Sequence, residues 1–219
     1  MFYDLNIQRP DTNEEDNLKL IISRGVKFGY KGFAVTTNLD ESIFEKNKKE
    51  KSKKSNSNET SSVIPLPLDL KVFKTLYPNL YFFNRINIRI SQGSNLRKFT
   101  QCKNLKKYEL VSFQPENQDV LKALTGIPAI NILSFDPINK WDFTFNRKLY
   151  NQFVNQNVYF ELMYSPGIID SSARKNLFTV SHMYRAVGKS KNIIVTSGAS
   201  APHHIRSPYD KVKDSAKQQ

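Results

Sequence analysis

Cysteine, histidine and long apolar runs are scarce in this sequence of 219 residues. The single cysteine, Cys102, cannot form an intramolecular disulfide or a zinc site built from cysteines, as expected in the reducing cytosol or nucleus. Apolar stretches such as Ile127 to Leu133 are far shorter than the roughly 20 residues that span a bilayer, and the N-terminus lacks a secretory signal pattern. We therefore expect neither a membrane protein nor a secreted protein.

Motifs for nucleotide and metal chemistry are also lacking. No Gly-x-Gly-x-x-Gly pattern follows the first predicted strand, and no Walker-type Gly-Lys-Ser/Thr loop occurs. A metal hydrolase needs several histidine and carboxylate ligands in one place, but the chain has only His182, in a helical pattern, and the adjacent pair His203 and His204 on a loop. Neighbouring side chains on an extended loop point apart, so we favour structural or RNA-facing roles for the histidines over metal ligation.

Positive charge is abundant: 33 Lys and Arg residues against 20 Asp and Glu residues leave a formal net charge of +13. This excess indicates a polyanionic partner, with nucleic acid favoured over an anionic membrane. The charge is concentrated in two tracts, at 85–107, interleaved with aromatic residues, and at 171–219. Guanidinium groups match phosphate oxygens and aromatic rings accept stacked bases, which is typical of proteins that bind irregular RNA. The residues that we expect to contact RNA are Arg97, Lys98, Arg174, Lys175, Arg206 and Lys211.

Arg85 is expected to have a different role, because it lies inside an apolar strand pattern at 80–90. A buried guanidinium normally pairs with a carboxylate, and Glu161 is the candidate partner. An alternative is that Asp4 and Glu161 form a carboxylate pair for acid–base catalysis, but neither a histidine nor a nucleophile accompanies them. We therefore predict a structural polar pair of Arg85 and Glu161, no catalytic residue and no metal site.

Predicted strands and helices alternate along most of the chain. Strands are predicted at 2–7, 32–36, 80–90, 109–113, 129–135, 158–163 and 192–196. Helices are predicted from 11 through 22 to an end near Gly25 or Gly29, and at 117–124, 145–154 and 171–187. This alternation predicts βαβ units and a parallel sheet, and the number and spacing of the strands favour a TIM-like (β/α) barrel of the α/β class in a single domain, 1–219.

Functional groups of such a barrel lie where the strands end, at its carboxyl face. The polar residues predicted at or near strand ends are Asp4, Asn6, Thr36, Asn38, Arg85, Gln114, Glu116, Glu161, Tyr164, Ser165, Ser197 and Ser200.

Two segments depart from the alternating pattern. Residues 38–62 are rich in Lys, Asn, Ser and Glu, and they offer too little apolar surface to offset the entropy of ordering. We interpret them as a disordered insertion, and its lysine run from Lys46 to Lys54 as a solvated loop in preference to a nuclear import signal or an arm for nucleic acid. Residues 207–219 are predicted to form a polar C-terminal tail.

A series of segments, in order and covering most of the chain apart from the insertion, carries a family resemblance. The segments are Phe2 to Ile7, Gly29 to Val35, Asn84 to Ile88, Tyr108 to Val111, Phe160 to Asp170, Lys191 to Ala199 and Ile205 to Asp210. The chain resembles the TIM-barrel-like protein component three family of eukaryotic and archaeal ribonuclease P, which eukaryotes share with ribonuclease MRP. The block from Phe160 to Asp170 is the most specific. The family is similar to polymerase-and-histidinol-phosphatase metal hydrolases without their metal site, and this sequence has Asp4 and Asn6 where those enzymes place two histidines.

The resemblance implies a noncatalytic RNA-binding subunit of ribonuclease P, and of ribonuclease MRP in rRNA processing. Its implied partners are the catalytic half of the ribonuclease P RNA, precursor tRNA indirectly during 5′ maturation, and a small α/β protein subunit. No cofactor is expected on this chain, and Mg²⁺ is expected on the RNA. The expected location is nuclear and nucleolar.

Alternative functions remain at this point. One is a metal-dependent phosphoesterase on the same barrel, and another is a general RNA chaperone. Members of the family continue beyond the block that ends at Asp210 with apolar helices that seal the barrel, whereas residues 211–219 here are polar. We therefore expect a barrel that is open or incomplete at its C-terminal end, whether the chain is truncated or a partner covers that end.

Overall fold

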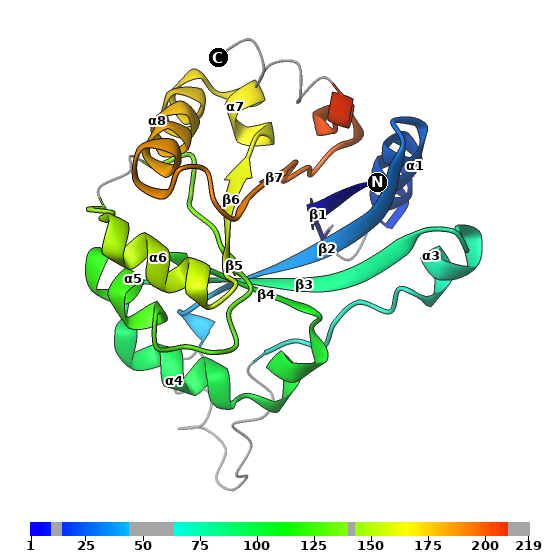
Figure 1. The fold of residues 1–219 in the computed structure, drawn as a ribbon. Helices are drawn as coiled ribbons and strands as arrows, with labels where there is room; N and C mark the ends of the chain where they lie inside the picture. The colour runs from blue at the N-terminus through cyan, green and yellow to red at the C-terminus, as the bar shows by residue number, and fades with distance from the viewer. Residues whose placement is uncertain (10–14, 44–63, 140–142, 210–219) are drawn as a thin grey trace, which may run out of the picture.

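The computed structural model describes residues 1–9, 15–43, 64–139 and 143–209, in which strands and helices alternate (Figure 1). The elements are β1 (Phe2–Gln8), α1 (Glu15–Lys27), β2 (Tyr30–Asp40), α3 (Lys71–Leu76), β3 (Tyr81–Ile90), α4 (Gly93–Gln101), the 3₁₀ helix η2 (Lys103–Lys107), β4 (Leu110–Pro115), α5 (Gln118–Leu124), β5 (Ile132–Leu133), α6 (Arg147–Asn155), β6 (Tyr159–Met163), α7 (Ser165–Ile169), α8 (Ser171–Gly188), β7 (Ile193–Thr196) and the 3₁₀ helix η3 (Pro202–His204). No helix in these ranges is both long and apolar enough to cross a membrane.

The seven strands within the described residues form one sheet in chain order, and every adjacent pair is parallel. The two edges of the sheet approach each other where the chain leaves β7. There the N–H of Gln8 donates to the carbonyl of Ala199 at 2.9 Å, and the N–H of Gly198 donates to the carbonyl of Asn6 at 2.9 Å. The sheet is thus a nearly closed (β/α) barrel, and the predicted TIM-like fold is confirmed.

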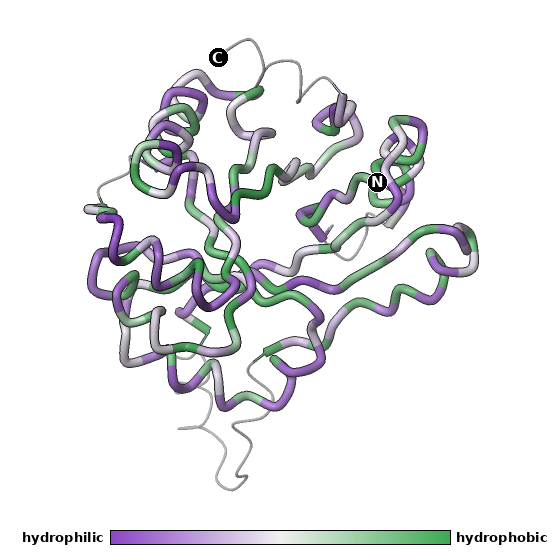
Figure 2. Tube along the Cα trace, viewed as in Figure 1, coloured by the Kyte–Doolittle hydropathy of each residue, from purple (hydrophilic) through white to green (hydrophobic). Residues whose placement is uncertain are grey.

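Two apolar clusters hold the helices against the outside of the barrel. The smaller cluster packs α1 and α3 against β1, β2 and β3, and the larger one packs α4, α5, α6 and α8 against β3 to β6. Hydrophobic and hydrophilic residues alternate along these helices, as Figure 2 shows for α8. Each helix therefore buries one face and exposes the other.

Local signals place the helix ends where the sequence predicts them. Asn117, Asn146 and Asp170 precede α5, α6 and α8, and each side chain accepts a hydrogen bond from a backbone N–H of the first helical turn. Helix α8 ends at Lys189, which adopts a left-handed conformation with φ 51°. The short helices α3, α4 and α7 were not predicted, because their few turns show little periodic pattern.

The insertion predicted at 38–62 begins later than its composition indicated. Residues 38–40 continue β2 and pair with Asn87, Ile88 and Arg89 of β3, and the side chain of Leu39 is buried. Backbone pairing and one apolar contact therefore outweigh the polar composition at this position. Residues 44–62 of the predicted insertion and residues 210–219 of the predicted tail lie outside the described residues. The strand predicted at 129–135 is reduced to two residues of β5.

Gly188 is the point of closest approach between α8 and the ring of Tyr150. A Cβ atom at position 188 would lie 2.0 Å from Cζ of Tyr150, which is fully buried and stacks on Phe160 with 4.0 Å between ring centroids. We expect Gly188→Ala to lower the free energy of unfolding by about 1–3 kcal/mol, because the buried ring cannot move without disturbing its neighbours. Urea denaturation measures this change. Gly93→Ala is the control, since a Cβ atom there has only ordinary contacts; equal midpoints for the two variants would contradict the prediction.

Candidate functional site

Arg85 and Glu161 form a buried ion pair across the interior of the barrel. Arg85 extends from β3 and Glu161 from β6, and both side chains are fully buried. The guanidinium donates through Nη1 to Oε1 and through Nη2 to Oε2, each at 2.6 Å. Nη1 also donates to the carbonyl of Leu5 at 2.9 Å. The two residues that the sequence analysis paired are thus joined by a two-pronged contact that fixes the distance between β3 and β6.

The environment of Glu161 keeps it ionised. Burial of the carboxyl group raises its pKa, but the charge of Arg85 and the hydrogen bonds from Arg85 and Thr196 outweigh the effect of burial. The pKa of Glu161 therefore lies below its ordinary value. A carboxylate whose oxygens are occupied by donors from three strands is suited to holding the barrel together, and it has little capacity left to accept a proton from a substrate.

A chain of side-chain hydrogen bonds runs around the barrel from the cation to the anion of this pair. In every bond of this chain, each residue donates to the next one on the way from Arg85 to Glu161, so each bond polarises the next. Beginning at Arg85, the bonds pass to Ser112, Asn87, Asn38, Gln8, Asn6 and finally Glu161. With Thr196, which also donates to Glu161, the circle connects six of the seven described strands.

Asp4 does not join Glu161, because a bulge in β1 separates the two. Asp4 is in register with Phe33, and Ile7 with Val35, so that β1 has one residue more than β2 between these pairs. Asn6 consequently points to Glu161, whereas Asp4 Oδ1 accepts from the N–H of Ser197 at 3.0 Å. The alternative of an Asp4–Glu161 carboxylate pair is therefore wrong, and each carboxylate has a structural partner instead.

The carboxyl-end mouth of the barrel contains a hollow of about 440 Å³ whose polar lining consists of five amides, the carboxylates of Asp40 and Asp136, and the guanidinium of Arg89. The amide side chains lining it are those of Asn6, Gln8, Asn38, Asn87 and Gln114. Amides can donate and accept hydrogen bonds but do not titrate near neutral pH, so they provide neither a general base nor a charged metal ligand. The nearest cation, Arg89, is paired with Glu116 and with Asp136, the latter at 3.9 Å. This mouth can contact an uncharged polar group, and it is poorly suited to phosphate.

The histidines lie apart from the mouth. His203 and His204 occupy η3, and their rings lie 4.2 Å apart, edge to face, because η3 is a turn of 3₁₀ helix; the expectation that they point apart on an extended loop is wrong. Burial and the neighbouring His203 lower the pKa of His204. Among the described residues, no three His, Cys, Asp or Glu side chains gather in a group that could hold a metal ion.

The basic residues predicted to contact RNA come from three segments of the fold, and those of α4 lie on a different side of the barrel from those of α8. Arg97 and Lys98 lie on α4, which Figure 1 shows on the opposite side of the barrel from α8. Arg174 and Lys175 lie on α8, and both are exposed. Arg206 follows η3, and Lys211 lies outside the described residues. The sequence tracts therefore do not form one continuous patch, and their contact with RNA stays a prediction.

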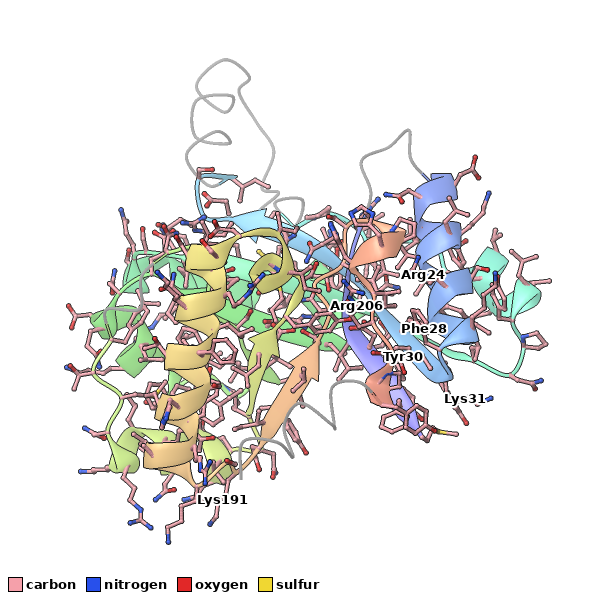
Figure 3. All side chains as sticks on the ribbon, turned by 90° about the horizontal axis from the view of Figure 1, so that it is seen from above. Arg24, Phe28, Tyr30, Lys31, Lys191 and Arg206 are labelled. Carbon is pink, nitrogen blue, oxygen red and sulfur yellow. The ribbon has the colours of Figure 1, made fainter. Side chains whose placement is uncertain are left out.

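Arg206 is held by two tyrosines near the barrel seam. The Tyr30 hydroxyl donates to the carbonyl of Arg206 at 3.1 Å, and the N–H of Arg206 donates to the Tyr164 hydroxyl at 2.9 Å. Burial, aided by the charge of Asp4, raises the pKa of both tyrosines, so the hydroxyls stay neutral. Figure 3 shows Arg206 on the same side as Tyr30, with Arg24, Phe28 and Lys31 nearby, and Lys191 far from them.

Four members of the hydrogen-bonded circle were not predicted from the sequence. Two of them are Ser112 and Thr196. The other two are Gln8 and Asn87. Both lie two residues beyond a polar residue of the same strand, Asn6 and Arg85, and therefore on the same face of that strand. Extending the strand pattern by one period would have found them. The predicted strand-end residues Asn6, Asn38 and Gln114 do line the mouth.

Relatives of known sequence support the resemblance. The chain is 24% identical over 213 residues to the "Probable ribonuclease P protein subunit 3" of Schizosaccharomyces pombe, covering 96% of this chain and 81% of that protein. It is 22% identical over 129 residues to the "Protein GAMETOPHYTE DEFECTIVE 1" of Arabidopsis thaliana. That match covers 58% of this chain, but the chain spans only 22% of the Arabidopsis protein.

Solved structures share the fold. A chain of an archaeal ribonuclease P, solved by cryo-EM with mature tRNA, superposes with a TM-score of 0.68 at 17% identity, covering 97% of this chain and 81% of that chain. Histidinol phosphate phosphatase from Lactococcus lactis superposes with a TM-score of 0.52 at 7% identity, covering 98% of this chain and 91% of the other. The family described as "RNase P subunit p30" matches residues 1–213. The chain therefore belongs to the RNase P subunit p30 family.

Proposed function

We propose that this chain is an RNA-binding protein subunit of the ribonuclease P ribonucleoprotein and has no catalytic site of its own. The observation that carries this proposal is the family match over residues 1–213. The net charge of +13 supports a polyanionic partner.

The chemistry of the barrel mouth favours this role over a metal-dependent phosphoesterase. The phosphoesterase needs charged ligands around a metal ion and an activated water. Here the hollow at the mouth is lined by five amides and two carboxylates, Asp40 and Asp136, and no three His, Cys, Asp or Glu side chains of the described residues form a group that could hold a metal ion. The interior carboxylate Glu161 is paired with Arg85. Phosphodiester chemistry is then the task of the RNA, with Mg²⁺ bound to the RNA, and this chain supports the folded state of the RNA.

The partners follow from this assignment. We infer binding to the catalytic half of the ribonuclease P RNA, indirect action on precursor tRNA in 5′ maturation, and association with a small α/β protein subunit. Function in ribonuclease MRP and a nuclear, nucleolar location belong to the same proposal. Purification of the tagged chain from its own cells tests it: ribonuclease P RNA and 5′ cleavage of precursor tRNA should copurify. Their absence, or bulk RNA without enrichment of this RNA, would reject the proposal.

The purified, RNA-free protein is expected to cleave neither precursor tRNA nor simple phosphodiesters with Mg²⁺, Mn²⁺ or Zn²⁺. The reason is that both oxygens of Glu161 accept from Arg85, and Oδ1 of Asp4 accepts from the N–H of Ser197. Cleavage is measured with labelled substrate before and after nuclease treatment of the protein. Metal-dependent cleavage that survives this treatment and is abolished by Asp4→Ala would establish the phosphoesterase instead.

A further inference from the structure

Phe178 lies in the middle of the solvent-exposed face of α8. Its side chain is 51% exposed, although α8 has an adequate apolar face of its own in Ala173, Val180 and Tyr184, which are buried. Within the described residues, no ring contact is formed by Phe178. The packing of α8 therefore does not require an aromatic residue at this position, and a large apolar ring is left facing solvent.

The neighbours of Phe178 on this face are cationic or able to become so. Arg174 and Lys175 precede it by four and three residues, and His182 and Arg185 follow it by four and seven, so all four lie on the same side of the helix. All four are exposed, and α8 contains no Asp or Glu. We name the surface formed by Arg174, Lys175, Phe178, His182 and Arg185 the α8 stripe.

One cation of the stripe is fixed in position. The Nε–H of Arg174 donates to the carbonyl of Gly167, in the middle of α7, at 2.7 Å. The guanidinium is thereby held beside the helix with exposed N–H groups remaining. A cation that is already held in place loses less conformational entropy when it binds a phosphate.

The barrel mouth has the opposite charge. Asp40, Glu41, Glu116 and Asp136 lie at the carboxyl ends of the strands, and Arg89 is the cation among them. A polyanion is repelled from this rim and attracted to the α8 stripe. A protein partner with an acidic face could also meet the cations, but stacking on a lone ring between cations is a particular property of nucleic acid bases.

We propose that the α8 stripe binds a single-stranded segment of RNA, with an unpaired base stacked on Phe178 and phosphates contacted by Lys175 and Arg185. This inference rests on the proposed RNA-binding function and specifies where and how a strand is held. Base stacking is tolerant of sequence but requires an unpaired base, so a duplex can use the cations but cannot use the ring.

The test uses the full chain and two fluorescent probes, a 12-nucleotide oligoadenylate and a 12-base-pair RNA duplex. Phe178→Ala is expected to weaken oligoadenylate binding by about five- to 150-fold, with an unchanged salt slope, and to leave duplex binding nearly unaltered. Phe178→Trp should retain the affinity. Lys175→Ala should lower the salt slope for both probes. The matched control is Tyr81→Ala, which removes a ring that is 54% exposed at the start of β3.

Each outcome separates this inference from the proposed function. If the parent protein binds neither probe, RNA binding by this chain fails and the α8 stripe fails with it. If the parent binds both probes but Phe178→Ala equals Tyr81→Ala, the stacking contact is rejected while RNA binding stands. Equal weakening of the single strand and the duplex would reject base stacking as well. Base stacking would also be rejected if Phe178→Ala kept its RNA affinity but lost a protein subunit that copurifies with the parent. That result would make the α8 stripe a protein interface.

Discussion

Replacing Arg85 with alanine is expected to lower the free energy of unfolding by about 3–5 kcal/mol, the cost of leaving one buried charge without its partner. The carboxylate of Glu161 would remain fully buried and lose both of its 2.6 Å contacts. The hydrogen bond from Arg85 to Ser112, which begins the circle around the barrel, would be lost as well. Urea denaturation at neutral pH measures the change, and an Arg85→Ala variant with the midpoint of the parent would refute the structural assignment.

Two further variants separate the loss of the ion pair from simple loss of a side chain. Arg89→Ala removes an arginine from a partly exposed ion pair with Glu116 and should cost less than about 1 kcal/mol. The double variant Arg85→Met with Glu161→Gln removes both charges, keeps a hydrogen-bond acceptor for Asn6 and Thr196, and should recover part of the stability. A double variant less stable than Arg85→Ala would show that the ion pair is not the cause.

The dependence of stability on pH provides an independent measure of the same pair. The pKa of Glu161 is lower in the folded chain than its ordinary value of 4.5. Its contribution to stability is therefore fully present above about pH 4.5 and is lost as the pH falls through the folded pKa. We expect the acid-induced loss of stability to be smaller in Glu161→Gln than in the parent over this acidic range.

A combined alanine variant of Arg174, Lys175, Arg206 and Lys211 is expected to lower the salt slope of RNA binding by about 3. Each lost phosphate contact removes roughly 0.7–0.9 from the slope, because its released counterions no longer contribute. Affinity should fall by about two orders of magnitude at physiological salt. The dissociation constant for ribonuclease P RNA is measured from about 50 to 300 mM salt, which spans the range where counterion release dominates.

The controls for this variant follow from the contacts of the four residues. Arg174 also donates to the carbonyl of Gly167, so its replacement can loosen α7. A triple variant that retains Arg174, together with thermal unfolding of each variant, distinguishes a lost phosphate contact from a damaged fold. Lys74→Ala on α3 removes an exposed lysine outside the predicted set. An unchanged slope in the quadruple variant would overturn the assignment of these residues.

The barrel could be predicted from the sequence because its signals are local. The period of two in Phe2 to Ile7 and the apolar runs at 80–90 and 158–163 mark strands, and Asn117, Asn146 and Asp170 mark helix starts. Each signal depends on a few adjacent residues, so it can be recognised without knowledge of the rest of the chain. The prediction of a disordered insertion from composition was wrong at 38–40, because pairing with β3 makes these residues part of β2.

The sequence by itself determined the order of strands and helices, the pairing candidate for Arg85, the positive charge and the family. The tertiary structure decided the hydrogen-bonded circle, the bulge that separates Asp4 from Glu161, and the placement of the basic residues of α4 and α8 on different sides of the barrel. Asn6 and Glu161 are 155 residues apart in the chain and meet only because the sheet closes. The basic residues of α4 and α8 are likewise placed on different sides of the barrel by the order of strands. Local patterns specify which face of an element is buried, but the closure of the barrel specifies which buried groups face each other.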